Sequence, residues 1–378
     1  MENVAALQGG PAATCVARRT IEEVGMTVDE ARVEQLMGTM VGYMTGSAVC
    51  FSIWLGDELG LYRVMAGSGP LSAGDVASRA KCNERLVREW LDAQSAGGLV
   101  SYDAAADRYE LGDEAAMVLS DDESPVFVAR AMNAMGSMYI DMEKVREAFR
   151  GDGGLSWKDH HQHLFCGTEW FFRTGYRAML ATAWIPALDG VTDKLERGAR
   201  VADIGCGHGA SVVVMAEAFP NSTFHGYDFH EDSIATARKR AADAGVADRT
   251  SFEVASAKDY PGTYDLVCFF DCLHDMGDPV GIARYAREHL DPDGTVLLVE
   301  PFALDRRAEN IAQNPMAALL YSASMSICTP NSLSQEVGLG LGAQAGEDRL
   351  RDVFTEAGFS TFRRATETPL NMVLEARI

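Results

Sequence analysis

The strongest chemical signal in this 378-residue chain is a glycine-rich loop that follows a short apolar run. Residues 201–209 read VADIGCGHG, and a helical pattern begins directly after Gly205, Gly207 and Gly209. Glycine lets the backbone turn tightly from a strand into a helix and lets a ligand approach the main chain closely. The sequence therefore predicts a ligand cradle, although a tight turn without a ligand would have the same pattern.

Two carboxylates narrow the type of ligand. Asp228 ends the next apolar run, where it can accept hydrogen bonds from both hydroxyls of a ribose. Gly205, Gly207 and Ala210 also satisfy the G-x-G-x-x-A form of a dinucleotide fingerprint. Asp203, however, would face a pyrophosphate badly and suits a ligand that carries an ammonium group. These residues favour S-adenosylmethionine over NAD.

A second polar motif, FDCLHDMGDP at 270–279, follows a later apolar run. In open α/β sheets ligands bind beyond the carboxyl ends of the strands, and His274 falls there. An imidazole titrates near neutral pH, so it can deprotonate an acceptor hydroxyl for an in-line displacement. Asp278 and Pro279 also look like the N-cap and first residue of a helix, which leaves a structural role for His274 open.

Alternating short strands and helices from Arg200 onward predict a Rossmann-like, doubly wound parallel sheet that would position these residues. The last two apolar runs have no helix between them, so they must pair as an antiparallel hairpin. This ending argues against the further βαβ unit of a dinucleotide-binding fold. The expected strands cover 200–205, 222–228, 250–255, 264–270, 294–300, 360–365 and 372–377, and the expected helices 209–219, 231–244, 279–290 and 347–357.

The N-terminal part predicts a mostly helical winged-helix domain. Helical periodicity runs from Val33 to Gly60, and two short helices follow with Ser72 and Asn83 as their N-caps. A hairpin is expected after them, over 99–111. The expected domains are an arm at 1–29, the winged helix at 30–124, a helical connector or cap at 125–190 and a ligand-binding domain at 191–378.

Composition argues against several functions. The formal charge is −22, and such an acidic chain repels nucleic-acid phosphates and anionic lipids. The second winged-helix helix, at 83–97, has two basic and three acidic side chains, which suits homodimerisation better than DNA reading. The sequence has no run near 18 consecutive apolar residues, no signal-peptide pattern and no CxxC pair. We therefore expect a cytoplasmic protein that binds neither membrane nor nucleic acid.

The motif DIGCGHG at 203–209, with Asp228 and the terminal hairpin, resembles class I S-adenosylmethionine-dependent methyltransferases. The winged helix resembles the dimerisation domain of plant-type and polyketide-tailoring O-methyltransferases. FDCLHDMGDP and SLSQEVGLGLGAQAGE at 332–347 are similar to segments of a group of actinobacterial methyltransferases. The resemblance implies a homodimer that uses S-adenosylmethionine, releases S-adenosylhomocysteine and acts on a small-molecule acceptor.

The same resemblance assigns catalytic roles. His274 matches the histidine of the plant HDWSD stretch, which deprotonates the acceptor hydroxyl. Glu300 and Glu347 loosely match the acidic residues that orient the histidine or the substrate. The lysine that opens the plant pattern is replaced by Phe270, and the Gly-Asp pair usual after the third strand reads Ala255-Ser256. The substrates of the plant family therefore do not transfer to this chain.

The cofactor site is expected to combine the glycine loop with residues around it. Ser256 or Phe229 would contact the adenine. Tyr176, on a helix before the sheet, would reach the carboxylate at the methionine end of the cofactor. The expected cofactor-binding residues are Asp203, Gly205, Gly207, Gly209, Asp228, Phe229, Ser256, Asp271 and Tyr176.

The acceptor itself is not identified by the sequence. Many aromatic residues and methionines at 125–185, together with the long segment at 304–346, predict a cap over an apolar or aromatic molecule. His160, His161 and His163 cannot all reach one metal from a helix face, so no metal site is expected. O-methylation is favoured over N-, S- or C-methylation only because of His274. The alternatives are a protein of this fold that binds S-adenosylmethionine without methylating, and a winged-helix DNA-binding regulator.

Overall fold

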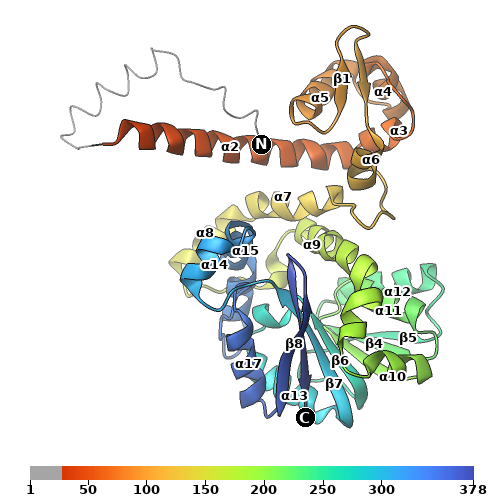
Figure 1. The fold of residues 1–378 in the computed structure, drawn as a ribbon, viewed down its shortest axis with the longest axis vertical. Coiled ribbons are helices and arrows are strands. Elements are labelled where there is room, and N and C mark those ends of the chain that lie inside the picture. Colours follow the sequence, from red (N-terminus) through yellow and green to blue (C-terminus); the bar gives the residue numbers. More distant parts are fainter. Residues whose placement is uncertain (1–27) are drawn as a thin grey trace. The chain divides into compact units, whose positions relative to one another are not determined.

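The computed structural model describes residues 28–378, so the arm predicted at 1–29 lies almost wholly outside the described residues. The chain divides into two compact units between Ala116 and Met117, whereas the boundary expected from the sequence falls after residue 124 (Figure 1).

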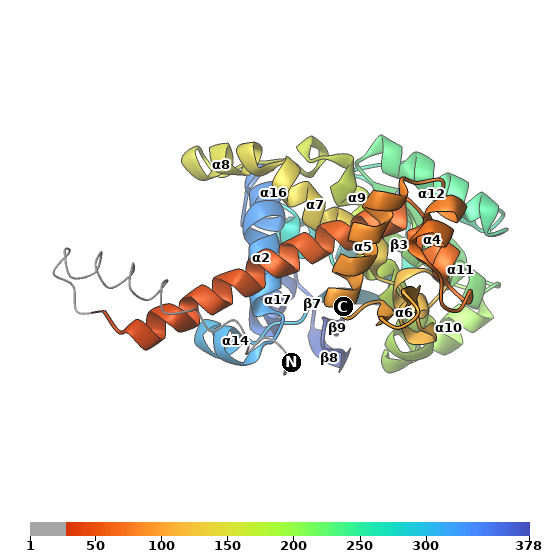
Figure 2. The same cartoon turned by 90° about the horizontal axis from the view of Figure 1, so that it is seen from above.

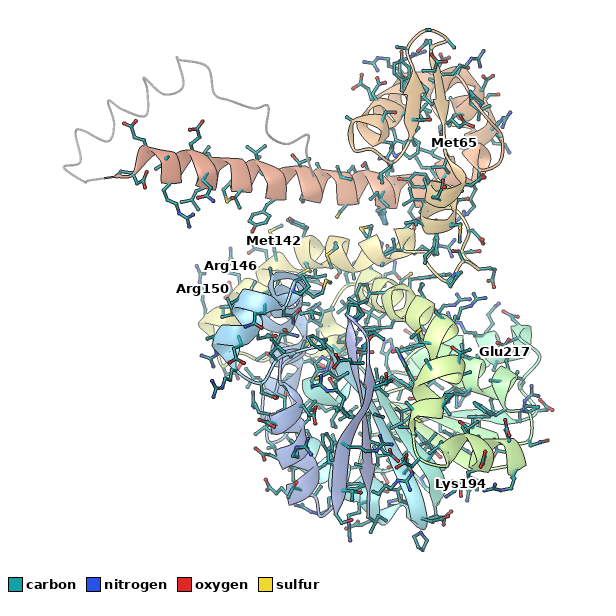
Figure 3. The ribbon with its side chains drawn as sticks, viewed as in Figure 1. Met65, Met142, Arg146, Arg150, Lys194 and Glu217 are labelled. Carbon is teal, nitrogen blue, oxygen red and sulfur yellow. The ribbon has the colours of Figure 1, made fainter. Side chains whose placement is uncertain are left out.

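The first unit is the predicted winged helix. Ser72 and Asn83 cap their helices as expected, and Ser72 forms a capping box with Asp75. Tyr62 and Trp90 pack edge to face in the core, and Met65 is buried in the same unit (Figure 3). The elements are α2 (Glu30–Glu58), α3 (Leu61–Met65), α4 (Ala73–Ala80), α5 (Glu84–Ala96), β1 (Ser101–Asp103) and β2 (Arg108–Glu110), followed across the boundary by α6 (Asp113–Leu119).

Helix α2 presents an exposed apolar surface. Its N-terminal part extends beyond the rest of the unit in both views (Figures 1 and 2), and a Cβ added at Gly38, Gly42 or Gly46 would meet nothing within 4 Å among the described residues. By length and composition α2 could cross a membrane, with a mean hydropathy of 1.3 over 18 residues. No such segment is expected from the sequence, because the longest apolar stretch near the start, 49–55, is interrupted by Ser52 and stopped by Gly56 and Asp57. The exposed apolar side chains include Leu36, Met37, Met40, Val41, Tyr43, Met44 and Phe51.

The second unit is built on a seven-stranded sheet of order β5-β4-β3-β6-β7-β9-β8. The first five strands in this order are parallel, and β9 runs antiparallel to both β7 and β8. The pairing of β8 with β9 is the terminal hairpin that the sequence predicted. This confirms the expected fold class. The strands are β3 (Arg200–Ile204), β4 (Thr223–Asp228), β5 (Thr250–Val254), β6 (Tyr264–Phe270), β7 (Leu290–Pro301), β8 (Thr361–Glu367) and β9 (Asn371–Arg377).

Helices cover both faces of this sheet. Successive strand residues point to opposite sides, and because both sides are apolar here, each is buried beneath helices. Val201 packs in one core with α10 (Val191–Arg197), α11 (Ala210–Ala218) and α12 (Glu231–Asp243). Its neighbour Ala202 packs in the other core with α13 (Pro279–Glu288) and α17 (Glu347–Glu356) (Figure 1).

The predicted cap is helical in both of its segments. Two stretches, η3 and η6, are π-helical, a geometry that often occurs at functional sites. The elements of the first segment are η1 (Ala129–Ala131), α7 (Met132–Ile140), α8 (Met142–Arg150), η2 (Trp157–Asp159), α9 (Gln162–Gly175), η3 (Tyr176–Trp184) and η4 (Ile185–Ala187). Those of the second are α14 (Arg307–Gln313), α15 (Ala317–Ala323), η6 (Ser324–Cys328) and α16 (Thr329–Leu333). A further short helix, η5 (Leu273–Asp275), lies outside the cap and follows β6.

Candidate active site

A cavity of about 440 Å³ lies at the carboxyl ends of β3, β4 and β6. Aromatic side chains from the cap, including Trp157, Phe165 and Phe172, form part of its wall. Seven of the predicted site residues also line it: Tyr176, Gly205, Gly207, Asp228, Phe229, Ser256 and Asp271. The cap and the sheet thus bring together residues that are as far as 95 positions apart, such as Tyr176 of η3 and Asp271 after β6.

The three glycines of the loop differ in what they do. All have left-handed φ angles, of 75° at Gly205, 50° at Gly207 and 73° at Gly209. A Cβ at Gly207 would meet nothing within 4 Å, so this glycine leaves room on the cavity wall. A Cβ at Gly209 would lie 2.8 Å from the ring of Phe252. Gly209 was predicted to bind the cofactor, but it lies behind the wall and is a glycine because α11 packs tightly there.

Asp203 is buried beneath the cavity wall with one unsatisfied oxygen. It is 1% exposed, and its Oδ2 accepts a hydrogen bond from the hydroxyl of Ser211, a wall residue. Its Oδ1 has no partner among the described residues. Burial raises the pKa of Asp203 to about 7. A buried carboxylate oxygen without a partner is costly, and a ligand ammonium group would compensate it.

Asp228 ends β4 with both carboxylate oxygens held by the backbone. Oδ2 accepts from the amide of Gly207 at 2.9 Å and Oδ1 from that of His230 at 2.8 Å. Each oxygen keeps a further acceptor position, which suits a pair of ribose hydroxyls. Phe229 is half exposed on the same wall, beside Ser256, where an adenine ring could stack.

His274 and Glu300 form a buried pair. The imidazole Nδ1 contacts Oε2 of Glu300, and the backbone amide of His274 donates to Oε1 at 3.2 Å. Their exposed fractions are 4% and 2%. Burial alone lowers the pKa of His274, but the Glu300 carboxylate and the nearby Cys328 outweigh it and raise this pKa well above its usual value. His274 lies directly behind the wall, between the wall residues Cys272 and Asp275.

Glu347, the third residue predicted to be catalytic, binds two arginines in this structure. Its carboxylate binds Arg351, one turn further along α17, and Nε of Arg364 on β8 at 2.7 Å. The ion pair with Arg364 joins α17 to the edge strand β8, whereas the one with Arg351 lies within α17. Among the described residues, it is Glu300 and not Glu347 that contacts His274.

Two acidic residues of the wall have surroundings that the sequence did not reveal. Glu169 of α9 is bound by Nδ1 of His208, in the glycine loop, at 3.1 Å and by Arg240 at 2.7 Å. Asp271 has a left-handed φ of 51° and accepts hydrogen bonds from Asn371 and Tyr176. No local pattern marks these contacts, because their partners come from distant segments.

The histidine cluster of the cap is not gathered around one point. His160 is buried, and its Nδ1 faces Asp141 at 3.2 Å, while His161 caps α9. The sequence pattern shows no carboxylate partner for this cluster, because Asp141 lies about 20 residues earlier in the chain. Among residues 28–378, no group of three potential ligands is arranged to hold a metal ion.

Comparison with known proteins agrees with this geometry. Residues 195–358 match the family described as "Methyltransferase domain", and residues 47–121 match the "Rv2258c-like winged HTH domain". The 27-O-demethylrifamycin SV methyltransferase of Amycolatopsis mediterranei is 33% identical over 128 residues, which are 32% of this chain and 47% of that enzyme. The chain thus spans about half the length of the curated relatives it matches.

Solved structures show the same fold over nearly the whole chain. The mitomycin 7-O-methyltransferase MmcR superimposes with a TM-score of 0.66 at 19% identity, over 93% of this chain and 100% of that one. Human N-acetylserotonin methyltransferase in complex with SAM gives 0.68 at 18% identity, over 93% and 99%. Residues 47–121 thus match a winged-helix domain and residues 195–358 a methyltransferase domain, and the chain shares the fold of solved methyltransferases, one of them in complex with SAM.

Proposed function

We propose that this protein transfers a methyl group from S-adenosylmethionine to a hydroxyl of a small, apolar or aromatic acceptor, with His274 as the general base. The observation that carries the proposal is the buried His274–Glu300 pair directly behind a cavity formed by the glycine loop. The names of the rifamycin and mitomycin relatives, both O-methyltransferases, support the same reaction.

The residues of the cavity fit the parts of the cofactor. S-adenosylmethionine, when bound, supplies an electrophilic methyl group on a sulfonium. Asp228 would accept the ribose hydroxyls, and the free Oδ1 of Asp203 would compensate the ammonium end. Phe229 or Ser256 would contact the adenine. Tyr176 and Asp271, which also line the cavity and are hydrogen-bonded to each other, would lie near the methionine end.

Glu300 orients the base. It holds Nδ1 of His274, so the proton of the neutral ring stays on that nitrogen and Nε2 is left to take the proton of the acceptor. Because the pKa of His274 is raised, the acceptor-free imidazole keeps its proton to higher pH than an ordinary histidine does. The reaction therefore requires loss of that proton before the acceptor can be deprotonated.

The exposed surface of α2 supports a homodimer, whereas the proposed cytoplasmic location rests on the sequence alone. Gly38, Gly42 and Gly46 recur every four residues, so they lie along one stripe of the helix and allow another helix to approach closely. The exposed methionines and aromatic residues around them would be buried in such a pair. This use of the winged-helix unit agrees with the acidic charge that argues against nucleic acid.

The runner-up is a protein that binds S-adenosylmethionine without methylating. It is favoured by one observation: the imidazole of His274 lies behind the cavity wall and not on it. A winged-helix DNA-binding regulator is the third candidate, and its second helix lacks the positive face that DNA reading needs.

Calorimetric titration of the ligand-stripped protein tests the proposal first. We expect S-adenosylhomocysteine to bind with micromolar affinity and NADH, the parallel control, not to bind. An acceptor screen scored by S-adenosylhomocysteine release then follows, with phenols and polyketide-derived aromatics. Cofactor binding without turnover on any acceptor class would favour the runner-up, and binding of NADH alone would overturn the proposal.

A further inference from the structure

The turn that follows His274 is held by side chains from the cap. Asn331 of α16 donates from its amide to the carbonyl of Asp275 at 3.0 Å. The amide of Gln335 spans the same turn, because its Oε1 accepts from the amide of Gly277 at 3.0 Å and its Nε2 donates to the carbonyl of Asp275 at 3.3 Å. Polar backbone groups of this turn are thus paired with side chains that lie 56 to 60 positions away in the chain.

The main chain of the same segment closes around the turn. The amide of Leu339 donates to the carbonyl of Gly277 at 2.9 Å, and that of Gly342 donates to the carbonyl of His274 at 3.1 Å. Between these contacts and α16 the segment passes through a left-handed φ of 73° at Val337. This conformation is rare for a β-branched residue and persists only where the surrounding structure holds it.

Asn331 also connects the turn to the aromatic wall of the cavity. Its side chain is 4% exposed, and its Oδ1 accepts from the backbone amide of Trp157 at 2.9 Å while its Nδ2 binds Asp275. Both Trp157 and Asp275 line the cavity. One buried amide therefore fixes the spacing between this wall and the residue next to His274.

We propose that Asn331 and Gln335 are positioning residues for His274, whose amides fix the turn after the histidine and thereby the direction of its imidazole. This inference rests on the proposed function, because it takes His274 as the base. Glu300 binds His274 itself, whereas the two amides hold the residues that follow it. The inference also assigns a role to the motif at 332–347, which contains Gln335.

The experiment follows the imidazole in the full-length, ligand-free protein, so a lost contact with a ligand cannot produce the result. The protein is labelled with ¹⁵N-histidine and titrated by NMR, and the His274 signal is identified by its loss in His274→Gln. Gln335 is exposed, so Gln335→Met removes its amide without disturbing a core. If the turn relaxes, the ring moves away from Glu300, and the apparent pKa of His274 should fall toward about 6.5, by about half a unit or more. Asn331→Leu, which also loses the bond to the cavity wall, should lower it further.

Matched controls make the same substitutions elsewhere in the cap. Gln344→Met removes an amide that binds Asn310 and the carbonyl of Phe302, and Asn314→Leu removes a buried amide that binds the same carbonyl. Among the described residues, neither of these amides bonds to the turn after His274. Both controls should therefore leave the titration of His274 unchanged.

The charges around His274 are the same in all four variants. The titratable groups that act on the imidazole are Glu300 of β7, Asp271 and Asp275 beside it in sequence, and Cys328 of η6, and none of them is substituted. A shift of the His274 pKa therefore reports the position of the ring.

An unchanged titration in Gln335→Met, or equal shifts in Gln335→Met and Gln344→Met, would overturn the inference. So would a shift in Asn331→Leu that is no larger than the shift in Asn314→Leu. Affinity for S-adenosylhomocysteine is measured in parallel by calorimetry. No binding by the wild type would refute the proposed function, whereas normal binding with an unshifted His274 would refute only the positioning role.

Discussion

Nδ1 of His274 and Oε2 of Glu300 meet in the interior although the two residues are 26 positions apart in the chain. His274 follows β6 and Glu300 lies near the end of the adjacent parallel strand β7, so the sheet register brings them together. Glu300 also accepts the backbone amide of His274, and it thereby fixes both the ring and the main chain of η5. A carboxylate in this position can orient an imidazole as a base.

Replacing either member of the pair should reduce turnover more than cofactor binding. His274→Gln removes the base, and we expect kcat to fall by about 10²- to 10⁴-fold. Glu300→Gln leaves the base but loses its orientation and should have a smaller effect. Affinity for S-adenosylhomocysteine, measured by calorimetry, should change little in both. Glu347→Gln is the control, because it removes a carboxylate of the same domain that binds arginines instead. Full kcat in His274→Gln would refute the assignment of the base.

The rate should rise with pH. The Glu300 carboxylate raises the pKa of His274 well above about 6.5, so the neutral, basic form of the ring accumulates only at higher pH. Profiles of kcat between about pH 6 and 10 should therefore show an ascending limb with its midpoint above the usual pKa of a histidine, about 6.5. In Glu300→Gln the negative charge is gone, and the midpoint should move to lower pH. A rate that is already maximal at pH 6 would contradict a raised pKa of His274.

Much of the methyltransferase domain could be predicted from local patterns. The alternation of strands and helices and the final hairpin predict the sheet, and parallel strands place the residues after them at one edge. Gly205 and Asp228 therefore lie on one wall, as expected.

The remaining features depend on contacts between distant segments. Glu347 matches a family pattern, but Arg364, 17 residues later, binds its carboxylate. Asp271 adopts a left-handed backbone, and its partner Asn371 comes from the last strand. The glycine stripe of α2 contacts nothing among the described residues. In the sequence, its glycines only interrupt a run of apolar residues, so the stripe was not predicted.

Cofactor binding should depend on pH through Asp203. Burial raises its pKa to about 7 in the ligand-free protein, whereas a bound ammonium group would keep it ionised. Below pH 7 the carboxyl group must lose its proton on binding, so affinity for S-adenosylhomocysteine should fall by up to about tenfold per pH unit. Above about pH 8 the titration of Asp203 should no longer change this affinity. Calorimetry of Asp203→Asn should show weaker binding without this slope.

Asp275 provides the control for that experiment, because burial also raises its pKa to about 7 and it lies on the cavity wall. In Asp275→Asn, the affinity for S-adenosylhomocysteine should keep most of its dependence on pH. If the slope vanished in Asp275→Asn and persisted in Asp203→Asn, the ammonium would have to be assigned to Asp275.

Alanine substitutions at two glycines of the loop should differ in their effects on cofactor binding and on stability. At Gly207 a Cβ would enter open space on the cavity wall, so Gly207→Ala should weaken S-adenosylhomocysteine binding. It should lower the free energy of unfolding, and with it Tm, only through the cost of the left-handed φ, about 1–2 kcal/mol. At Gly209 the same change adds a clash with Phe252 to a similar backbone cost. Gly209→Ala should therefore lower Tm further, which differential scanning calorimetry would show. Equal Tm losses would contradict the difference in packing.

The stripe of glycines on α2 should control assembly. A Cβ added at Gly42 would meet nothing within 4 Å among the described residues, and the exposed Met40 and Met44 lie nearby on the same helix. If two copies pair through this stripe, Gly42→Leu separates the helices and should convert a dimer into a monomer in sedimentation velocity. Glu89→Leu, which adds the same side chain to the exposed surface of α5, should leave the dimer intact.

The same helix allows a competing explanation, because its length and composition also suit a membrane span. The two explanations differ in what covers the apolar side chains. A protein–protein interface predicts a detergent-free dimer that remains in the supernatant after ultracentrifugation with lipid vesicles. A membrane helix predicts that the wild type floats with the vesicles and that Gly42→Leu, which adds an apolar side chain, floats as well. A detergent-free wild-type monomer would refute pairing through α2.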